Sequence, residues 1–327
     1  MHSRKNILVP LALIIAACGA LPVRAADAIK DYPQRPVRFV LPFPAGSSSD
    51  SVARILAPKM SERLNQNVIV ENRPGAGGMF GAGYVAKSTP DGHTLLFLSG
   101  AFTAQAASIK LLPYDPLRDF AWVSMALTYP FVVVMRADSQ VQTVPQLIAA
   151  AKNNPGKLNF ASVGTGSVFH LAGELFNVMA GVNMTHIPYK GGTEPVTELI
   201  GGRIDVIFST MTGVYQHILS NRLRAIAIAS LERSPQLPNL PTVAETLPGF
   251  EVISFAGLAA PRDTPASVVA RLNREMRAIL DQPDVRKRIA DQGGEAHPTS
   301  PEEMRRHVEG EISKWKRIVA ARKIEVE

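Results

Sequence analysis

Two loops rich in glycine and hydroxyl side chains hold the residues best suited to chemistry in this sequence. The first, PFPAGSSSD at residues 42–50, follows the apolar run VRFVL and precedes a helical pattern; the second, SVGTGSVFH at residues 162–170, has the same setting. A helix N-terminus presents unpaired N–H groups and a partial positive charge, so it attracts anions. Each loop therefore predicts either an anion-binding end or ordinary capping of its helix.

Two such helix ends facing each other across a cleft would suit a ligand with an anionic group at each end, such as a dicarboxylate. Asp50 allows two interpretations, an acid in the first helical turn or the partner of a ligand amine or hydroxyl group. Lys190, in the stretch YKGG, is either a partner for a ligand carboxylate or a solvated lysine beside a turn.

Signatures of the common enzyme classes do not occur: the sequence has no G-x-S-x-G, G-x-x-x-x-G-K-[ST] or H-E-x-x-H. The stretch GAGYVA at residues 81–86 fits G-x-G-x-x-A, but ten residues separate it from the preceding apolar run. We interpret it as a tight glycine-rich loop that leads into a closely packed helix. His170 and Glu174 have a spacing that metal ligands use, but two ligands without a third favour a pair on a helix surface. We predict no catalytic residue, no metal and no cofactor. Four further histidines are isolated and predicted to be structural or solvated: His93, His186, His217 and His307.

Short apolar runs alternate with helical patterns along the chain. The runs predict strands at residues 37–41, 67–71, 94–98, 131–135, 158–162, 184–188, 204–208 and 225–229. Helices are predicted at residues 50–64, 167–180 and 265–281. The last helix begins with Ser300 as N-cap, Pro301 at its first position and Glu303 closing a capping box. This alternation predicts an α/β fold with mostly parallel sheets flanked by helices.

The C-terminal third is mostly helical and must pack on strands formed earlier. We therefore expect a discontinuous first domain of residues 26–128 plus 253–327 and an inserted second domain of residues 129–252. A cleft between two such domains is the usual place for a ligand.

The first 25 residues have the pattern of a secretory signal peptide: a basic start, an apolar run of 12 residues and the small-x-small end Val23-Arg24-Ala25. Cys18 is the chain's single cysteine, and the IAAC stretch around it alternatively fits a lipid-attachment site. The whole chain has 19% charged residues, and the part after the signal peptide has a mildly basic balance without clusters, which gives no indication of nucleic-acid binding. We expect an exported, periplasmic protein.

Several motifs in order resemble the Bug/TctC family, the extracytoplasmic solute-binding proteins of tripartite tricarboxylate transport systems. The resemblance covers nearly the whole mature chain and rests on VENRPGAGG (70–78), AKSTPDGHTLLF (86–97), HLAGELF (170–176), HIPYKGG (186–192), GGRIDVIF (201–208), PTVAE (241–245), LPGFE (247–251) and GLAAPRDTP (257–265). It implies a two-domain periplasmic-binding-protein fold of type II character that closes on a small carboxylated solute.

The resemblance also implies which residues surround the ligand. The first loop supplies Phe43, Ala45, Gly46, Ser47, Ser48, Ser49 and Asp50, and the second supplies Gly164, Thr165, Gly166 and Ser167; Tyr189, Lys190 and Asp205 match family positions near the cleft. LSGAF (98–102) is expected to form another wall. Ser47 stands where the family usually has a second glycine, so it is a candidate specificity position.

The expected function follows from the family. We expect a non-enzymatic monomer that captures a small organic acid (a dicarboxylate, an amino acid or an aromatic acid) and presents it to inner-membrane transporter subunits. A receptor subunit for a sensor kinase, or an exported enzyme, are the alternatives.

Overall fold

The computed structural model describes residues 32–189, 193–234 and 237–326. All the elements named below belong to one compact unit that begins at Pro33. The predicted signal peptide with Cys18, and Lys190, lie outside the described residues.

The described strands form one mixed sheet in the order β2-β1-β3-β9-β4-β7-β5-β6, with β8 and β10 pairing with β4 off this path. Their bounds are β1 Val37–Leu41, β2 Val68–Asn72, β3 Thr94–Ser99, β4 Phe120–Arg136, β5 Asn159–Ser162, β6 Thr185–Pro188, β7 Val206–Thr210, β8 Leu223–Ile228, β9 Ile253–Pro261 and β10 Glu295–Ala296. β1 is parallel to β2 and β3, and β5 is parallel to β6 and β7. The α/β class and all eight predicted strands are therefore confirmed, and apart from the start of β4 their ends differ from the prediction by a few residues at most. The sheet is mixed and not mostly parallel as predicted, because β4 and β9 make antiparallel pairings.

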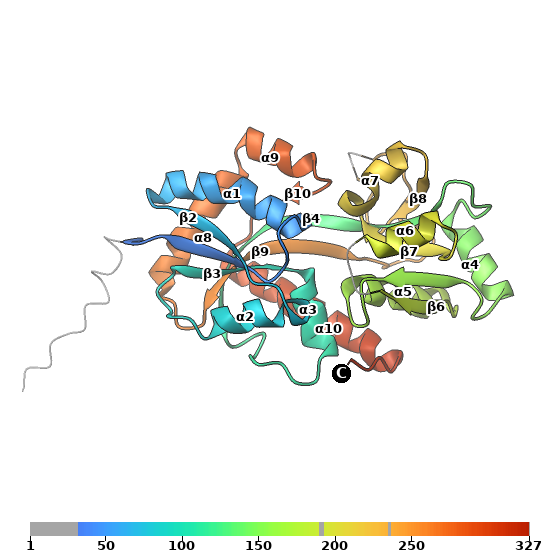
Figure 1. Ribbon diagram of the computed structural model, residues 1–327, viewed down its shortest axis with the longest axis horizontal. Coiled ribbons are helices and arrows are strands. Elements are labelled where there is room, and N and C mark those ends of the chain that lie inside the picture. Colours follow the sequence, from blue (N-terminus) through green and yellow to red (C-terminus); the bar gives the residue numbers. More distant parts are fainter. Residues whose placement is uncertain (1–31, 190–192, 235–236, 327) are drawn as a thin grey trace, which may run out of the picture. The chain divides into compact units, whose positions relative to one another are not determined.

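Two long strands, β4 and β9, run side by side through the middle of the sheet (Figure 1). They pair antiparallel from Phe120–Pro261 to Pro130–Ile253, and β4 then continues to pair antiparallel with β7 and β8. β9 and the first half of β4 are absent from the sequence prediction. β4 changes partners next to Pro130, close to the predicted domain boundary at residue 129; the division into two domains stays a prediction.

Helices connect and cover the strands. Their bounds are α1 Ser48–Leu64, α2 Met79–Ala86, α3 Gly100–Ser108, α4 Val144–Asn153, α5 Val168–Ala180, α6 Glu194–Ile200, α7 Met211–Leu219, α8 Ala266–Leu280, α9 Pro283–Ala290 and α10 Pro301–Ala321. The short helices η2 (Ala76–Gly78) and η3 (Val243–Glu245) complete the set within the described residues. The capping box of α10 is confirmed: Ser300 Oγ accepts from Glu303 N–H and the Glu303 carboxylate accepts from Ser300 N–H.

The C-terminal helix α10 joins two hydrophobic clusters. Met304, Val308 and Ile312 pack with the cluster around β1, β3 and β9, while Trp315 and Ile318 pack with the cluster around α5, β5 and β7. Trp315 is fully buried. Because burying one large apolar side chain contributes about 1.5–3 kcal/mol, this helix is a main contributor to stability.

One local prediction needs correction. GAGYVA at residues 81–86 lies inside α2 and is not a loop; the glycine-rich loop precedes it, at residues 74–78. The close packing of the helix is confirmed, because a Cβ at Gly81 would lie 2.9 Å from Pro42 Cα.

Candidate functional site

A cleft of about 780 Å³ lies where four strands end and four helices begin. The chain passes from β1 to α1, from β3 to α3, from β5 to α5 and from β7 to α7, and each turn contributes its helix N-cap to the lining: Ser47, Ser99, Ser167 and Thr210. Carboxyl ends of strands and N-termini of helices are where α/β proteins bind anionic ligands. The topology therefore brings together four helix ends that favour negative charge.

Asp50 holds the backbone of the first loop in place through hydrogen bonds on the side away from the cleft. One carboxylate oxygen accepts from Gly46 N–H (3.0 Å) and Arg54 Nε (2.9 Å), and the other accepts from Asn72 Nδ2 (2.9 Å). Burial raises the pKa of this carboxyl group, but the hydrogen bonds from Arg54, Gly46 and Asn72 outweigh it and hold the pKa below its usual value. Asp50 is 3% exposed and does not line the cleft, so this geometry favours the first-turn acid over a ligand partner.

Ser47 caps α1, its Oγ accepting from Asp50 N–H at 3.3 Å. Ser48 and Ser49, in the first turn, line the cleft beside it. Tyr129 lies on the same wall; burial raises the pKa of its phenol, and side-chain hydrogen bonds with Ser254 and Ser49 oppose that shift. The phenol therefore stays neutral at physiological pH.

The second loop is held by its own hydroxyl groups. Ser167 Oγ donates to Gly164 O (2.7 Å) and accepts from His170 N–H (3.3 Å). Ser162 Oγ donates to Gly164 O (3.0 Å) and accepts from Gly164 N–H (3.1 Å). These bonds set the backbone of Gly164, whose φ is +125°, a conformation that glycine tolerates without strain.

A buried polar network supports this loop. His170 Nδ1 accepts from Gly166 N–H (3.1 Å), and the His170 ring stacks on that of His186 at 3.7 Å between centroids. Glu174 accepts from Arg322 Nε (2.5 Å), beyond the end of α10. His170 and Glu174 are 4% and 6% exposed, so the prediction of a pair on the helix surface was wrong. Burial and the neighbouring His170 lower the pKa of His186 to about 3, and its Nε2 lies 2.7 Å from Ser162 Oγ.

The C-terminal segment contributes to the wall of the cleft through Val326. Val326 forms a bridge with Ile109, and both line the cleft. A Cβ at Gly166 would lie 2.7 Å from Val326 Cγ2 and 2.8 Å from Ser108 Oγ. A side chain at position 166 would therefore collide with this wall.

The structure brings together most of the predicted site residues. Phe43, Ser47, Ser48, Ser49, Gly164, Thr165, Gly166 and Ser167 line one cleft, and the expected further wall from LSGAF is present as Ser99 and Ala101. Ala45, Gly46, Asp50 and Tyr189 do not line it. Asp205 lies just before β7, and its carboxylate accepts from Asn159 N–H (2.8 Å). The residue of β7 that lines the cleft is Thr210, at the other end of the strand.

Sequence reasoning missed other lining residues. They come from the loop before α2, from α3, from β4 and β9 and from the C-terminus: Pro74, Gly75, Ala76, Gly77, Gly78, Met79, Gln105, Ser108, Ile109, Tyr129, Phe131, Ser254 and Val326. The one available signal was the PGAGG stretch, whose glycines indicate close approach of the backbone.

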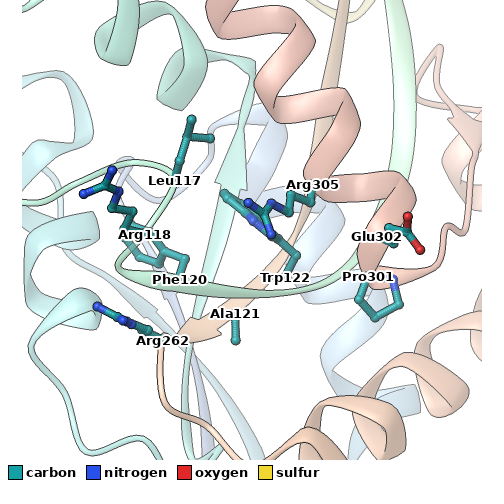
Figure 2. A pocket seen from close by; sticks show the side chains of 9 residues that line it. All are labelled: Leu117, Arg118, Phe120, Ala121, Trp122, Arg262, Pro301, Glu302 and Arg305. Carbon is teal, nitrogen blue, oxygen red and sulfur yellow. The ribbon is translucent and has the colours of Figure 1, made fainter.

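A smaller hollow of about 440 Å³ lies at the start of α10, and Figure 2 shows the side chains that line it. Its rim carries Arg118, Arg262 and Arg305, all largely exposed, and each has a carboxylate within 4 Å. Exposed ion pairs of this kind contribute little to stability. The cleft is the better candidate site, because four helix N-termini meet there. Within the part of the chain that the structure describes, no three His, Cys, Asp or Glu side chains are grouped to hold a metal ion.

The fold and the cleft define a solute-binding protein. The chain belongs to the family described as the tripartite tricarboxylate transporter family receptor, whose model matches residues 52–324. It is 40% identical to the UPF0065 protein of the tcbD–tcbE intergenic region of a Pseudomonas species, over 97% of this chain and 94% of that protein. It is 36% identical to the protein BugT of Bordetella pertussis, over 96% of each chain.

Solved structures of similar proteins share the fold. Rpa4515 of Rhodopseudomonas palustris, solved with adipate, has a TM-score of 0.81 and 33% identity, covering 90% of this chain and 99% of that one. MatC of the same organism, with bound malate, has a TM-score of 0.77 and 33% identity, covering 88% and 100%.

Proposed function

We propose that this protein binds a small carboxylated solute in the cleft and delivers it to a tripartite tricarboxylate-type transporter in the inner membrane. The observation that carries the proposal is the convergence of four helix N-termini, those of α1, α3, α5 and α7, on one cleft. Their unpaired N–H groups and hydroxyl caps suit carboxylate oxygens. The adipate and malate of the two solved relatives are both carboxylates.

The predicted residues divide into two roles under this proposal. Ser47 to Ser49 and Gly164 to Ser167 contact the ligand, whereas Gly46 and Asp50 shape the first loop from behind it. Capture involves closure of the two predicted domains around the solute. The bending is carried by β4, which continues across the predicted boundary, and by the chain just before β9, which begins at that boundary.

Export to the periplasm, a monomeric state and the absence of an enzymatic activity complete the proposal, in keeping with a family of solute-binding proteins. No described helix is long and apolar enough to cross a membrane.

A thermal-shift screen of carboxylic acids on the mature protein tests the proposal. A ligand present at 100 times its Kd adds about 2.7 kcal/mol to the free energy of unfolding. Amides of the same acids are the matched controls, because they keep shape and lose charge. A panel in which no acid raises the melting temperature, or turnover of a bound acid, would contradict the proposal.

A further inference from the structure

The cleft offers apolar faces as well as hydroxyl groups. Phe43, Met79 and Phe169 all line it and are half-buried, so part of each side chain is free to meet a ligand. Two further aromatic residues of the lining, Tyr129 and Phe131, are 8% and 1% exposed and support the wall without a free face. The partly free faces of Phe43, Met79 and Phe169 favour a ligand with apolar surface of its own, because small polar acids would leave them in contact with water.

The aromatic side chains are held in place from different elements. Phe169, at the start of α5, packs edge-on against Phe131 of β4, with ring centroids 5.1 Å apart and an interplanar angle of 61°. Phe131 is 1% exposed and fixes its neighbour. Phe43 comes from the first loop, and Ile109 and Val326 add aliphatic surface. A ligand ring between these side chains would gain edge or stacked contacts worth more than its buried area alone.

A ligand ammonium group has no carboxylate to meet in the described part of the lining. Asp50 is the one acid in the first loop (residues 42–50), and both of its oxygens are engaged by Gly46, Arg54 and Asn72. None of the described lining residues is Asp or Glu. An ammonium group would therefore meet only neutral hydroxyl and carbonyl oxygens among the described lining residues, and a neutral acceptor stabilises a buried charge less than a carboxylate does. The described lining favours acids that carry no ammonium group.

We infer that the cleft selects carboxylic acids with an aromatic body over amino acids, over aliphatic dicarboxylates and over small hydroxylated acids. This inference rests on the proposed function and narrows the three solute types that the sequence allows to one. The helix N-termini hold the carboxylate, and the side chains of Phe43, Met79 and Phe169 cover the ring.

Calorimetric titration of the mature protein with four matched compounds tests this inference. 3-Phenylpropanoate and L-phenylalanine differ only by the ammonium group, adipate supplies carboxylates without a ring, and malate is small and hydroxylated. We expect 3-phenylpropanoate to bind at least about tenfold more tightly than each of the other three, a difference of about 1.4 kcal/mol. Equal or tighter binding of phenylalanine, adipate or malate would overturn the inference and leave the proposed function standing. Failure of all four acids to bind would count against both.

Two variants locate the ring. Phe169→Ala and Phe43→Ala should each weaken 3-phenylpropanoate about tenfold and change adipate affinity less than about twofold. Tyr215→Ala, at a 42% exposed aromatic on α7 outside the cleft, is the control for loss of a ring. Phe169→Ala also removes the Phe169–Phe131 contact and could destabilise the fold. In that case Phe43→Ala alone tests whether the ring of the ligand lies in the cleft. Equal losses for both acids, or none, would overturn the inference.

Discussion

Replacing Asp50 by Asn tests whether this carboxylate shapes the first loop. Asn keeps the size of the side chain but has one acceptor oxygen where Asp has two, and the three donors that converge here come from Gly46, Arg54 and Asn72. In its least costly orientation the amide oxygen faces Gly46 and Arg54, and the hydrogen bond from Asn72 is lost. A hydrogen bond to a charged group contributes about 1.5–3 kcal/mol. The ion pair with half-exposed Arg54 adds little.

We therefore expect Asp50→Asn to lower the free energy of unfolding by about 2–3 kcal/mol at pH 7, measured by urea denaturation. Asp284→Asn is the matched control, because it removes the exposed ion pair with Lys59 (2.9 Å) and should cost less than about 1 kcal/mol. The Asp50 variant should also bind every acid more weakly, because the first loop loses the hydrogen bond between Asp50 and Asn72 that helps to hold it. Unchanged stability with selective loss of amine-bearing ligands would refute this reasoning and place Asp50 in the ligand site.

Further predictions concern the loop glycines and two buried histidines. Gly46 has a φ of +82° with open space around its Cβ position, so Gly46→Ala should cost only the backbone strain of about 1–2 kcal/mol. Gly166→Ala adds a collision with Val326 and should cost about 1–3 kcal/mol more and weaken acid binding; equal urea midpoints for the two variants would contradict this. Burial, chiefly, lowers the pKa of His307 to about 4 and that of His186 to about 3. The unfolded chain binds these protons more readily, so the free energy of unfolding should be nearly at its maximum at pH 7 and fall by about 2 kcal/mol between pH 7 and pH 5, allowing for partial exposure. In denaturation at both pH values, His307→Phe should reduce this loss, and an unchanged loss would contradict the assignment.

Periodicity in the sequence was enough to predict most elements. The apolar positions of α1 and α8, and the capping box of α10, depend on neighbours within a few residues, and all are confirmed. The first half of β4 and all of β9 depend on each other across more than 100 residues. In the sequence, Pro130 marks the boundary of the apolar run at residues 131–135. In the structure it lies inside β4, where the strand changes partners and the loss of an N–H donor is tolerated.

The residues of the site also divide into those that local sequence predicts and those that only the fold brings to the cleft. The two hydroxyl-rich loops could be predicted because capping chemistry is local. The loop of residues 74–78, Ser254 and Val326 reach the cleft only through the fold. His170 and Glu174 resemble a surface pair in sequence, because the cation that allows the carboxylate to be buried is Arg322, 148 residues away. Long-range partners of this kind leave no periodic signal.

A crystal structure of the mature protein with the acid that raises its melting temperature most would test the central claim directly. Our account predicts carboxylate oxygens within about 3 Å of N–H groups or hydroxyl groups at the starts of α1 and α5. A carboxylate bound elsewhere, for example among Arg118, Arg262 and Arg305 in the hollow beside α10, would contradict it.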